Sequence, residues 1–460
     1  MLIYNLEERG GKSLYEYLYI CLRDDIKCGK IPAHSKLPSK RALSRQLGVS
    51  VITVKNAYEQ LICEGYVTSV EKSGYYVLDV GHKTDIGDEP KFMTPPKDVK
   101  NDNIIYNLSS NTPNSEMFPF SVWSRLLRRV LAEEDAKLLR RVPSSGVYAL
   151  RLAISRFLFE SRGMDVSPDN IIIGAGTDYI YNLLTQLLGR NKRYGVENPG
   201  YKKIGDILSS CGVKFSYLEM DSFGVIPEKI NKCDVIHISS SHHYPTGIIM
   251  PPWRRDEILE YANRHNAHII DDDYDSEFRF TGKNVYPLFS RDGGKRVIYI
   301  NTFSQTISPS IRISYMVLPD DLLHKFKTEL GFYSCPVSSF EQYTLAAFIS
   351  EGYFEKHINR MRNYYNKQRQ IAIEAVYAQN NDKFVIMEEG AGMHFLLKIN
   401  TSFSDAQIKQ RCAERGLNIS FVSDFLYRKE PEYESLAVIN YTNTDGTQIC
   451  EALKILSESV

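Results

Sequence analysis

The sequence lacks a charge excess of either sign, a long apolar run and paired cysteines. Lysine plus arginine and aspartate plus glutamate each number 56 among 460 residues, so binding to nucleic acid would require a local basic patch. No run of eighteen apolar residues occurs, and we expect no membrane span. The eight cysteines include no Cys-x-x-Cys pair, which argues against a zinc site or a disulfide framework. Residues 1–8 lack the basic and apolar segments of a signal peptide, so we expect a cytoplasmic protein.

The composition is that of an ordinary globular protein with more than one domain. Apolar residues make up 43% of the chain and charged residues 24%, and the length is sufficient for two or three domains. From residue 79 to 103 the chain turns polar and proline-containing, without periodicity, which predicts a flexible linker. We therefore predict a multidomain protein with an N-terminal domain at 1–80, a linker at 81–104 and a large domain at 105–460.

The first eighty residues have the pattern of a helix-turn-helix. Apolar residues recur at helical spacing from 14 to 26 and predict a first helix. Ser39 is the predicted N-cap of a second helix, Gly48 forms a turn, and Ser50 is the predicted N-cap of a third helix. The residues predicted to face inward on the second helix are Ala42, Leu43 and Leu47. In such a unit the helix after the turn enters the major groove of DNA by its N-terminal residues.

A hairpin and a basic patch accompany these helices. Segments 66–70 and 75–78 flank residues 71–74 and predict two strands joined by a turn, the wing. Between residues 36 and 55 the chain has no acidic residue. The basic residues in that window are Lys36, Lys40, Arg41, Arg45 and Lys55. The alternative interpretation is a small helical bundle whose solvated face happens to be basic.

Four segments decide between these interpretations. Residues 37–43, 47–50, 57–61 and 64–66 resemble the GntR-type winged-helix domain almost throughout. The resemblance implies that double-stranded DNA is a partner. The residues that it implies for DNA contact are Ser39, Arg41, Ser50, Thr53, Lys55, Ser73 and Gly74. Val51 departs from the family, which commonly has a polar or basic residue there, and one base or phosphate contact is thereby in doubt.

The large domain alternates helical patterns with short apolar runs, which is typical of an α/β fold with a mostly parallel sheet. The predicted strands are 171–173, 193–196, 235–238, 268–270 and 297–300. Ligands of such sheets bind at the carboxyl ends of the strands. Residues 174–177 follow the first strand and suit a phosphate at a helix N-terminus, although a tight strand-to-helix turn explains them equally well.

Two further segments have alternative interpretations. Residues 271–279 contain four aspartates, one tyrosine and one glutamate, which could form a solvated acidic loop or a magnesium site. His242 and His243 are adjacent, but no third ligand lies at a suitable spacing, so we predict no metal site.

Taken in order, segments 174–177, 197–201, 241–247, 271–279 and 302–312 resemble the fold-type I aminotransferases. More narrowly, the whole chain resembles the MocR regulators, which fuse a GntR-type winged helix to an aminotransferase-like domain. The resemblance implies a large α/β fold-type I domain with a small C-terminal α+β subdomain from about residue 330. It also implies a homodimer and a pyridoxal phosphate site. The residues implied to bind this cofactor are Ala175, Gly176, Thr177, Tyr201, Asp272, Tyr274, Ser304 and Arg312. In the family, the position of Asp272 pairs with the pyridinium nitrogen, that of Tyr274 bonds the ring hydroxyl, and that of Arg312 holds the phosphate.

Gln305 departs from the family at the position of the lysine that forms the Schiff base with the cofactor. An amide nitrogen is not a nucleophile and cannot form an imine with an aldehyde. Segment 436–441, which corresponds to the family's stretch with the substrate-binding arginine, contains no arginine, and Ala175 removes a hydroxyl donor. We therefore predict no catalytic residue and pyridoxal phosphate bound only without a covalent bond.

These observations favour a cytoplasmic transcription regulator whose aminotransferase-like domain acts as a sensor and dimerisation module. Its effector would be a small molecule such as an amino acid or a vitamin B6 derivative. One alternative is a DNA-binding scaffold whose large domain holds no cofactor. Another is an active aminotransferase that uses a different lysine, such as Lys295. Whether the chain is an enzyme stays open, with the missing lysine arguing against it.

Overall fold

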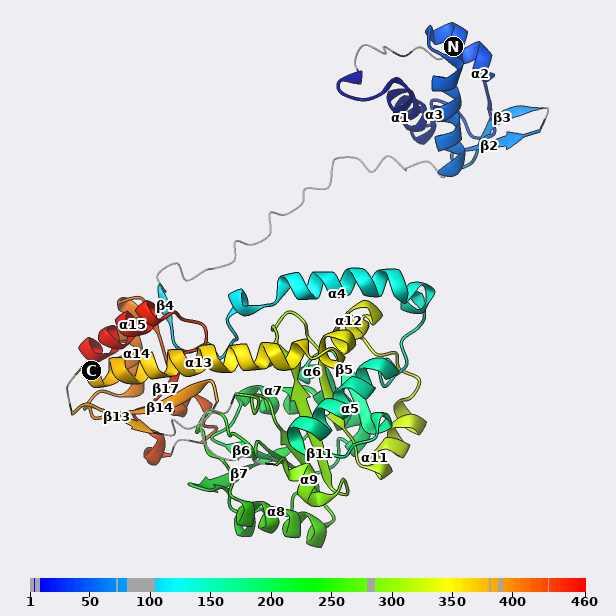
Figure 1. The fold of residues 1–460 in the computed structure, drawn as a ribbon. Helices are drawn as coiled ribbons and strands as arrows, with labels where there is room; N and C mark the ends of the chain where they lie inside the picture. The colour runs from blue at the N-terminus through cyan, green and yellow to red at the C-terminus, as the bar shows by residue number, and fades with distance from the viewer. Residues whose placement is uncertain are drawn as a thin grey trace. The chain divides into compact units, whose positions relative to one another are not determined.

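The computed structural model describes residues 4, 9–71, 73–80, 104–278, 286–379, 382–387, 392–428 and 430–460. Backbone contacts divide the chain into two compact units, Met1–Val99 and Lys100–Val460, each of which is described by itself (Figure 1). The predicted linker, 81–104, lies outside the described residues except for Ile104, as do Lys72 of the wing and Arg279. No helix in the described ranges is long and apolar enough to cross a membrane.

The N-terminal unit is a winged helix-turn-helix, as predicted. Its helices are α1 (Leu14–Lys27), α2 (Lys40–Leu47) and α3 (Val51–Cys63). Its strands are β1 (Lys36–Leu37), β2 (Val67–Val70) and β3 (Gly74–Val77), which pair antiparallel in the order β1-β3-β2. The predicted hairpin is confirmed, whereas β1 is too short to be recognised in the sequence. Leu18, Leu22, Leu43, Val54 and Leu61 are buried in the core of this unit.

Both predicted N-caps of this unit are confirmed. The Ser39 hydroxyl accepts a hydrogen bond from the Ala42 amide at 3.2 Å, and that of Ser50 accepts one from the Thr53 amide at 3.0 Å. Ala42 itself was predicted to face inward, and that prediction is wrong because its side chain is exposed. Ser44 is buried instead, and its hydroxyl donates to the Val49 carbonyl at 2.6 Å.

The large unit is built on an eight-stranded sheet with the order β5-β12-β11-β10-β9-β6-β7-β8. Its strands are β5 (Ile171–Gly174), β6 (Tyr194–Asn198), β7 (Phe215–Asp221), β8 (Gly224–Val225), β9 (Val235–Ile238), β10 (His268–Asp272), β11 (Val297–Thr302) and β12 (Ser314–Val317). Strands β11, β10, β9, β6 and β7 are parallel, whereas β12 and β8 pair antiparallel with their neighbours. The predicted mostly parallel sheet is confirmed.

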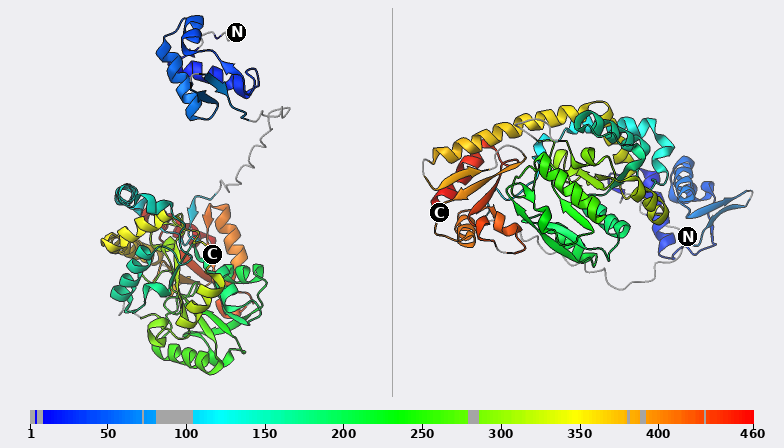
Figure 2. Two further views of the ribbon diagram at one scale, coloured as in Figure 1. Left: turned by 90° about the vertical axis from the view of Figure 1, so that its right-hand side faces the viewer. Right: turned by 90° about the horizontal axis from the view of Figure 1, so that it is seen from below.

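Helices cover both faces of this sheet because its strands alternate their apolar side chains between two cores. Ile171, Ile173 and Tyr299 point into one core, and Ile172 and Ile298 point into the other. The helices before, between and after these strands are α4 (Phe120–Glu133), α5 (Tyr148–Arg162), α6 (Thr177–Leu188), α7 (Lys202–Ser210), α8 (Pro252–His265), α9 (Leu288–Asp292), α10 (Phe303–Thr306), α11 (Asp320–Lys325) and α12 (Ser339–Ser350). Figure 2 shows the sheet between its helical layers.

A small C-terminal α+β part completes the large unit. Its antiparallel sheet has the order β13-β14-β17-β16. Its elements are α13 (Tyr353–Ala378), β13 (Phe384–Met387), β14 (His394–Ile399), α14 (Asp405–Glu414), β15 (Leu417–Asn418), β16 (Ser420–Phe421), β17 (Leu436–Asn440) and α15 (Gly446–Ser459). The 26-residue helix α13 runs alongside the large sheet and on to this part (Figure 1). The short β4 (Tyr106–Asn107) pairs with β15, so the first described residues of the unit join its C-terminal part.

Candidate functional site

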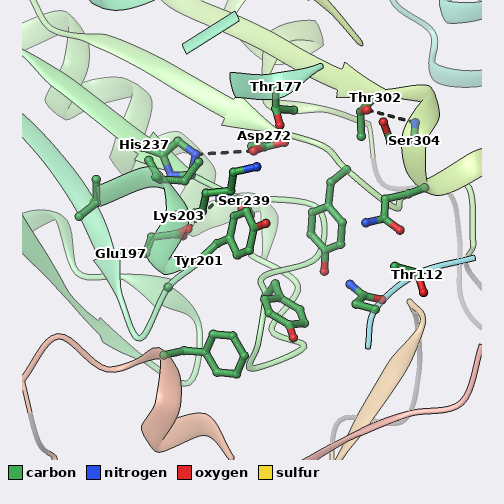
Figure 3. A pocket seen from close by; sticks show the side chains of 18 of the residues that line it. Thr112, Thr177, Glu197, Tyr201, Lys203, His237, Ser239, Asp272, Thr302 and Ser304 are labelled. Atoms are coloured by element: carbon green, nitrogen blue, oxygen red, sulfur yellow. Dashed lines mark hydrogen bonds and ion pairs between the residues drawn. The ribbon is translucent and has the colours of Figure 1, made fainter. Parts of the chain in front are cut away.

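A cavity of about 460 Å³ lies at the carboxyl ends of the central strands of the large sheet. Its walls include Glu197 of β6, His237 of β9, Asp272 at the end of β10 and Thr302 at the end of β11. Thr302, Ser304 and Thr112 lie across the cavity from His237 and Glu197 (Figure 3). Phe425 and Tyr427 of the C-terminal part close another side.

Asp272 lines this cavity and has one oxygen without a hydrogen-bond partner in the described part of the chain. Its Oδ2 accepts a hydrogen bond from the Tyr181 hydroxyl at 2.9 Å and lies 3.7 Å from Nε2 of His237. Its Oδ1 is buried and has no hydrogen-bond partner among the described residues. Burial, with the nearby Asp272 charge, raises the pKa of Tyr181 well above its ordinary value, so that hydroxyl remains a donor. A buried carboxylate oxygen without a partner suits a positively charged N–H donor of a ligand.

Tyr274 lies near Asp272 and is connected to a buried histidine and aspartate. Its hydroxyl is 3.2 Å from Nδ1 of His242, and that nitrogen is 2.9 Å from Oδ2 of Asp275. Burial, with a smaller contribution from the Asp275 carboxylate, raises the pKa of Tyr274 well above its ordinary value. The hydroxyl therefore keeps its proton at neutral pH and can donate a hydrogen bond to an anionic oxygen of a ligand.

Two cations gather at the N-terminus of α6. Nζ of Lys203 lies 2.7 Å from Oδ1 of Asp178, and Nη2 of Arg312 lies 3.1 Å from Oδ2 of the same carboxylate. Burial raises the pKa of Asp178, but the two ion pairs outweigh burial and lower the net pKa. Gly176 adopts a φ of +86°, and a Cβ atom there would lie 2.6 Å from Arg312 Nη2. The backbone thus leaves room for the guanidinium at a helix N-terminus, where an anion is stabilised.

Gln305 lies on the short helix α10 and lines the cavity beside Ser304. The hydroxyl of Thr302 accepts a hydrogen bond from the Ser304 amide at 3.1 Å, and the Ser314 hydroxyl donates to Thr302 at 2.8 Å. These contacts fix the turn that carries residue 305. Oε1 of Gln305 is buried and has no hydrogen-bond partner among the described residues.

Glu197 of the cavity wall and the buried His243 beside it form a contact that sequence reasoning missed. Burial raises the pKa of Glu197 well above its ordinary value, although the Ser239 amide donates to its Oε2 at 3.1 Å. Nε2 of His243 lies 3.5 Å from the same oxygen, and burial lowers the pKa of His243 to about 3. Burial therefore favours the protonated form of the carboxyl, and the imidazole is uncharged at neutral pH. Among the residues that the structure describes, no group of His, Cys, Asp and Glu side chains could hold a metal ion.

Most of the predicted cofactor residues meet in this cavity. Those that line it are Thr177, Tyr201, Asp272, Tyr274, Ser304 and Arg312, together with Gln305. Gly176 lies behind Arg312, and Ala175 packs partly buried against the larger core rather than lining the cavity. Lys295 precedes β11, at the end of that strand opposite Gln305, and is not among the lining residues. Lys203 does line it, and only its placement two residues after Tyr201 could have indicated this from the sequence.

The residues predicted for DNA contact belong to α2 and its N-cap, to the start of α3 with its N-cap, and to the wing. Arg41 and Lys55 are exposed, and Lys55 forms an i,i+4 ion pair with Glu59 at 3.6 Å. Ser39, Ser50 and Thr53 take part in the two helix N-termini described above. The remaining two predicted residues are Ser73, whose hydroxyl lies 2.7 Å from that of Tyr76, and Gly74, whose φ is +127°.

Comparisons with known proteins agree with both units. The profile of the family "Bacterial regulatory proteins, gntR family" matches residues 14–77, and that of "Aminotransferase class I and II" matches residues 103–453. The chain is 34% identical over 447 residues, 96% of each chain, to the HTH-type transcriptional regulator YdeL of Bacillus subtilis. It is 30% identical over 474 residues to the probable rhizopine catabolism regulatory protein MocR of Rhizobium meliloti, covering 98% of this chain and 94% of that one. It is 29% identical to the pyridoxine biosynthesis transcriptional regulator PdxR of Corynebacterium glutamicum, over 88% of this chain and 87% of that one.

Solved structures agree on the fold of the large unit. The multiple substrate aminotransferase of Thermococcus profundus superimposes with a TM-score of 0.69 at 22% identity, covering 79% of this chain and 92% of that one. The kynurenine aminotransferase of Pyrococcus horikoshii gives a TM-score of 0.68 at 23% identity, covering 77% and 90%. The chain is a DNA-binding transcription regulator with an aminotransferase-like unit, and it belongs to the MocR-type regulators.

Proposed function

We propose that the large unit is a sensor that holds pyridoxal phosphate or a related vitamin B6 phosphate without a covalent bond. The single observation that carries the proposal is the contrast between two parts of the cavity. Asp272 keeps a buried, unpartnered oxygen, and two cations lie at the start of α6. Gln305 stands where the family's covalent lysine would be. The residues present therefore fit the cofactor but not its covalent capture.

Each residue would have a separate part in holding the ligand. Asp272 would accept the N–H of a protonated pyridine nitrogen, and its buried charge would keep that nitrogen protonated. Tyr274 would donate to the ring oxygen, and Arg312 with Lys203 would hold the phosphate, which must share these cations with Asp178. When bound, pyridoxal phosphate supplies an electron-withdrawing ring and an aldehyde. Gln305 cannot capture that aldehyde, so the ligand would leave again as its concentration falls.

A regulator with a reversibly bound ligand can report the concentration of that ligand to DNA. The relative PdxR is named for regulation of pyridoxine biosynthesis, which supports a vitamin B6 compound as the effector. An amino acid bound alongside or attached to the vitamer is the other effector class in the proposal. A regulator of this kind would act in the cytoplasm, where its DNA lies.

A homodimer is part of the proposal. Leu139 is 82% exposed and Phe332 67% exposed, which is unusual for large apolar side chains. Phe332 stacks on Tyr333 with ring centroids 4.4 Å apart, and Arg141 connects this segment to that of Leu139 by donating to the Phe332 carbonyl at 2.7 Å. Burial of this apolar set between two copies would account for its exposure. Sedimentation at micromolar concentration tests it, and a monomer would contradict it.

The test of the sensor is a titration of the full chain with pyridoxal phosphate, followed by absorbance. We expect a saturable signal that dialysis removes, and a change in affinity for a DNA duplex that the full chain selects from a random pool. No signal at millimolar ligand would overturn the proposal and favour the DNA-binding scaffold.

A second candidate function rests on Lys203, the one lysine among the described residues that line the cavity. If Lys203 reacted with pyridoxal phosphate, the chain could be an active aminotransferase. Its amine is occupied by Asp178 at 2.7 Å, which favours an anion-binding part instead. Borohydride reduction and mass spectrometry separate the two, because only the enzyme would carry a stable adduct on residue 203.

A further inference from the structure

The first turn of α3 carries two exposed apolar side chains. Val51 is 43% exposed and Ile52 is 68% exposed, and they are the first two residues of the helix. Most of the isoleucine side chain is thereby left in contact with water, where it adds nothing to the stability of the fold. It is therefore available to a partner that binds this surface.

The rest of α3 fixes the direction in which Ile52 points. The buried residues of the helix form one stripe at helical spacing: Val54, Ala57, Tyr58 and Leu61. At 3.6 residues per turn, Ile52 lies on the opposite side of the helix, in line with the exposed Asn56 one turn later. The Tyr58 hydroxyl donates to the Pro38 carbonyl at 2.9 Å and connects the helix to the segment before α2. Ile52 is thus directed outward by a helix that is itself held in place.

The start of the helix is equally well defined. The Ser50 hydroxyl accepts a hydrogen bond from the Thr53 amide at 3.0 Å and lies 2.8 Å from the Thr53 hydroxyl. These contacts fix the first turn, and with it the backbone of Val51 and Ile52. The second helix of a helix-turn-helix enters the major groove by its N-terminal residues. Both apolar side chains therefore belong to the part of α3 that meets the base edges.

The chain around this turn is basic. Arg41, Arg45 and Lys55 are exposed, and no acidic residue occurs between residues 36 and 55. Such cations attract DNA phosphates, but contacts to phosphate carry no sequence information. On the floor of the major groove the apolar group is the C5-methyl of thymine, whereas the other base edges present hydrogen-bond donors and acceptors. Exposed apolar side chains at the start of α3 therefore match thymine.

We infer that Ile52, with Val51 beside it, packs against the C5-methyl groups of thymine and so makes α3 select thymine at one or two positions of its DNA site. The inference goes beyond the sensor proposed above and does not depend on any vitamer. It assigns the choice of base at these positions to apolar contacts, while the cations supply affinity for DNA of any sequence.

Replacing thymine by deoxyuridine tests the inference, because it removes only the methyl group. A duplex that the full chain selects from a random pool is rebuilt with deoxyuridine at one thymine at a time, and fluorescence anisotropy measures each affinity. We expect affinity to fall about fourfold at one or two thymines for each bound α3, the effect of one buried methyl group. Thymines outside the bound segment are the control and should show no change. Sensitivity at no thymine would overturn the inference.

Variants of α3 separate a contact with these side chains from an effect of the methyl group on DNA shape. At the thymine that each residue contacts, Ile52→Ala and Val51→Ala should bind the thymine and deoxyuridine duplexes equally, within about twofold. Leu78→Ala, at a side chain that is 37% exposed and outside the predicted contacts, should keep the full difference. Thermal unfolding should be unchanged in all three, which shows that they fold. A fourfold difference that persists in both α3 variants would overturn the inference.

Discussion

The winged-helix unit presents Arg41, Lys55 and Val51, at or beside its predicted DNA contacts, to solvent, whereas Asp272 and Tyr274 of the large unit are only partly exposed. Asp272 and Tyr274 are connected to Tyr181, His242 and Asp275 by hydrogen bonds inside the sheet and its loops. We therefore expect a change in the first unit to alter which DNA is bound without disturbing the fold. We expect a change at Asp272 or Tyr274 to affect several hydrogen-bonded groups together, and we propose that Gln305, which lines the same cavity, is where the site differs from one that binds its cofactor covalently.

The largest expected effect is that of Asp272→Asn on binding of a vitamin B6 phosphate. An amide oxygen can accept the ring N–H but carries no charge to keep the pyridine nitrogen protonated, so we expect binding to weaken by about 3 kcal/mol or more. Calorimetry with pyridoxamine phosphate and pyridoxal phosphate measures it. Asp256→Asn, which breaks a surface ion pair with Arg291, is the matched control and should leave binding unchanged. Unaltered affinity in Asp272→Asn would mean that the unpartnered oxygen is not part of the site.

DNA binding should depend on Arg41 more than on Lys55. Arg41→Ala should weaken binding to a selected duplex by about 1–3 kcal/mol if it reaches a base edge. Lys55 already shares its charge with Glu59, so Lys55→Ala should cost less. Fluorescence anisotropy at several salt concentrations measures both, and the affinity of the wild type should fall steeply with salt. Lys30→Ala, whose lysine pairs with Asp25 at 3.1 Å, is the control. A double variant at 41 and 55 that binds as tightly as the wild type would contradict the assignment of this surface.

Acid should destabilise the large unit through His243. Its pKa is lowered to about 3 in the folded protein, from an ordinary value of about 6.5. Because the unfolded chain binds this proton first, the contribution is complete above pH 6.5 and is lost as the pH falls toward 3. The variant His243→Gln has no side chain at this position that binds a proton in this pH range. Between pH 6.5 and 5, the free energy of unfolding of the wild type should therefore fall relative to the variant by about 1.4 kcal/mol per pH unit. Denaturant unfolding at several pH values measures this, and parallel curves would show that His243 is not buried in its neutral form.

The smallest expected effects are those of substitutions at Ser50. They separate its role as the N-cap of α3 from its predicted contact with DNA. Ser50→Ala removes the N-cap of α3 and should cost about 1 kcal/mol of stability. Ser50→Asp keeps the cap and so retains stability, but its negative charge should repel DNA phosphate and weaken binding. Thermal unfolding and anisotropy together distinguish capping from contact. If Ser50→Asp binds DNA as well as the wild type, Ser50 acts only as a cap.

The sequence predicted the parts of the fold that local patterns determine. Continuous apolar runs revealed β5, β9, β10 and β11, and the serine N-caps located α2 and α3. Strand β12 was not predicted because its four residues directly follow the segment that carries Gln305 and Arg312. The pairing of β4 with β15 was not predicted because it joins residues more than three hundred positions apart.

The candidate site shows the same division. Asp272, Tyr274 and Gln305 were predicted from the resemblance of segments 271–279 and 302–312 to the family's cofactor motifs, and they lie at or just after the ends of recognisable strands. The part of Lys203 depends on its contact with Asp178, and that of Glu197 on burial beside His243. Neither contact can be read from the sequence, because the tertiary fold brings these residues together from separate segments.

The variant Gln305→Lys tests most directly whether the cavity retains a cofactor site. If it does, a lysine at residue 305 should be enough for pyridoxal phosphate to bind covalently. Asp272, Tyr274 and Arg312 would hold the ring so that its aldehyde faces residue 305, and burial with nearby positive charge lowers the pKa of a lysine there. Mixed with pyridoxal phosphate, the variant should gain a visible absorbance band that survives dialysis and borohydride reduction, with the adduct on residue 305 by mass spectrometry, while the wild type gains none. A variant that folds normally, as judged by unchanged thermal unfolding, yet forms no adduct at residue 305 would contradict the presence of a retained cofactor site.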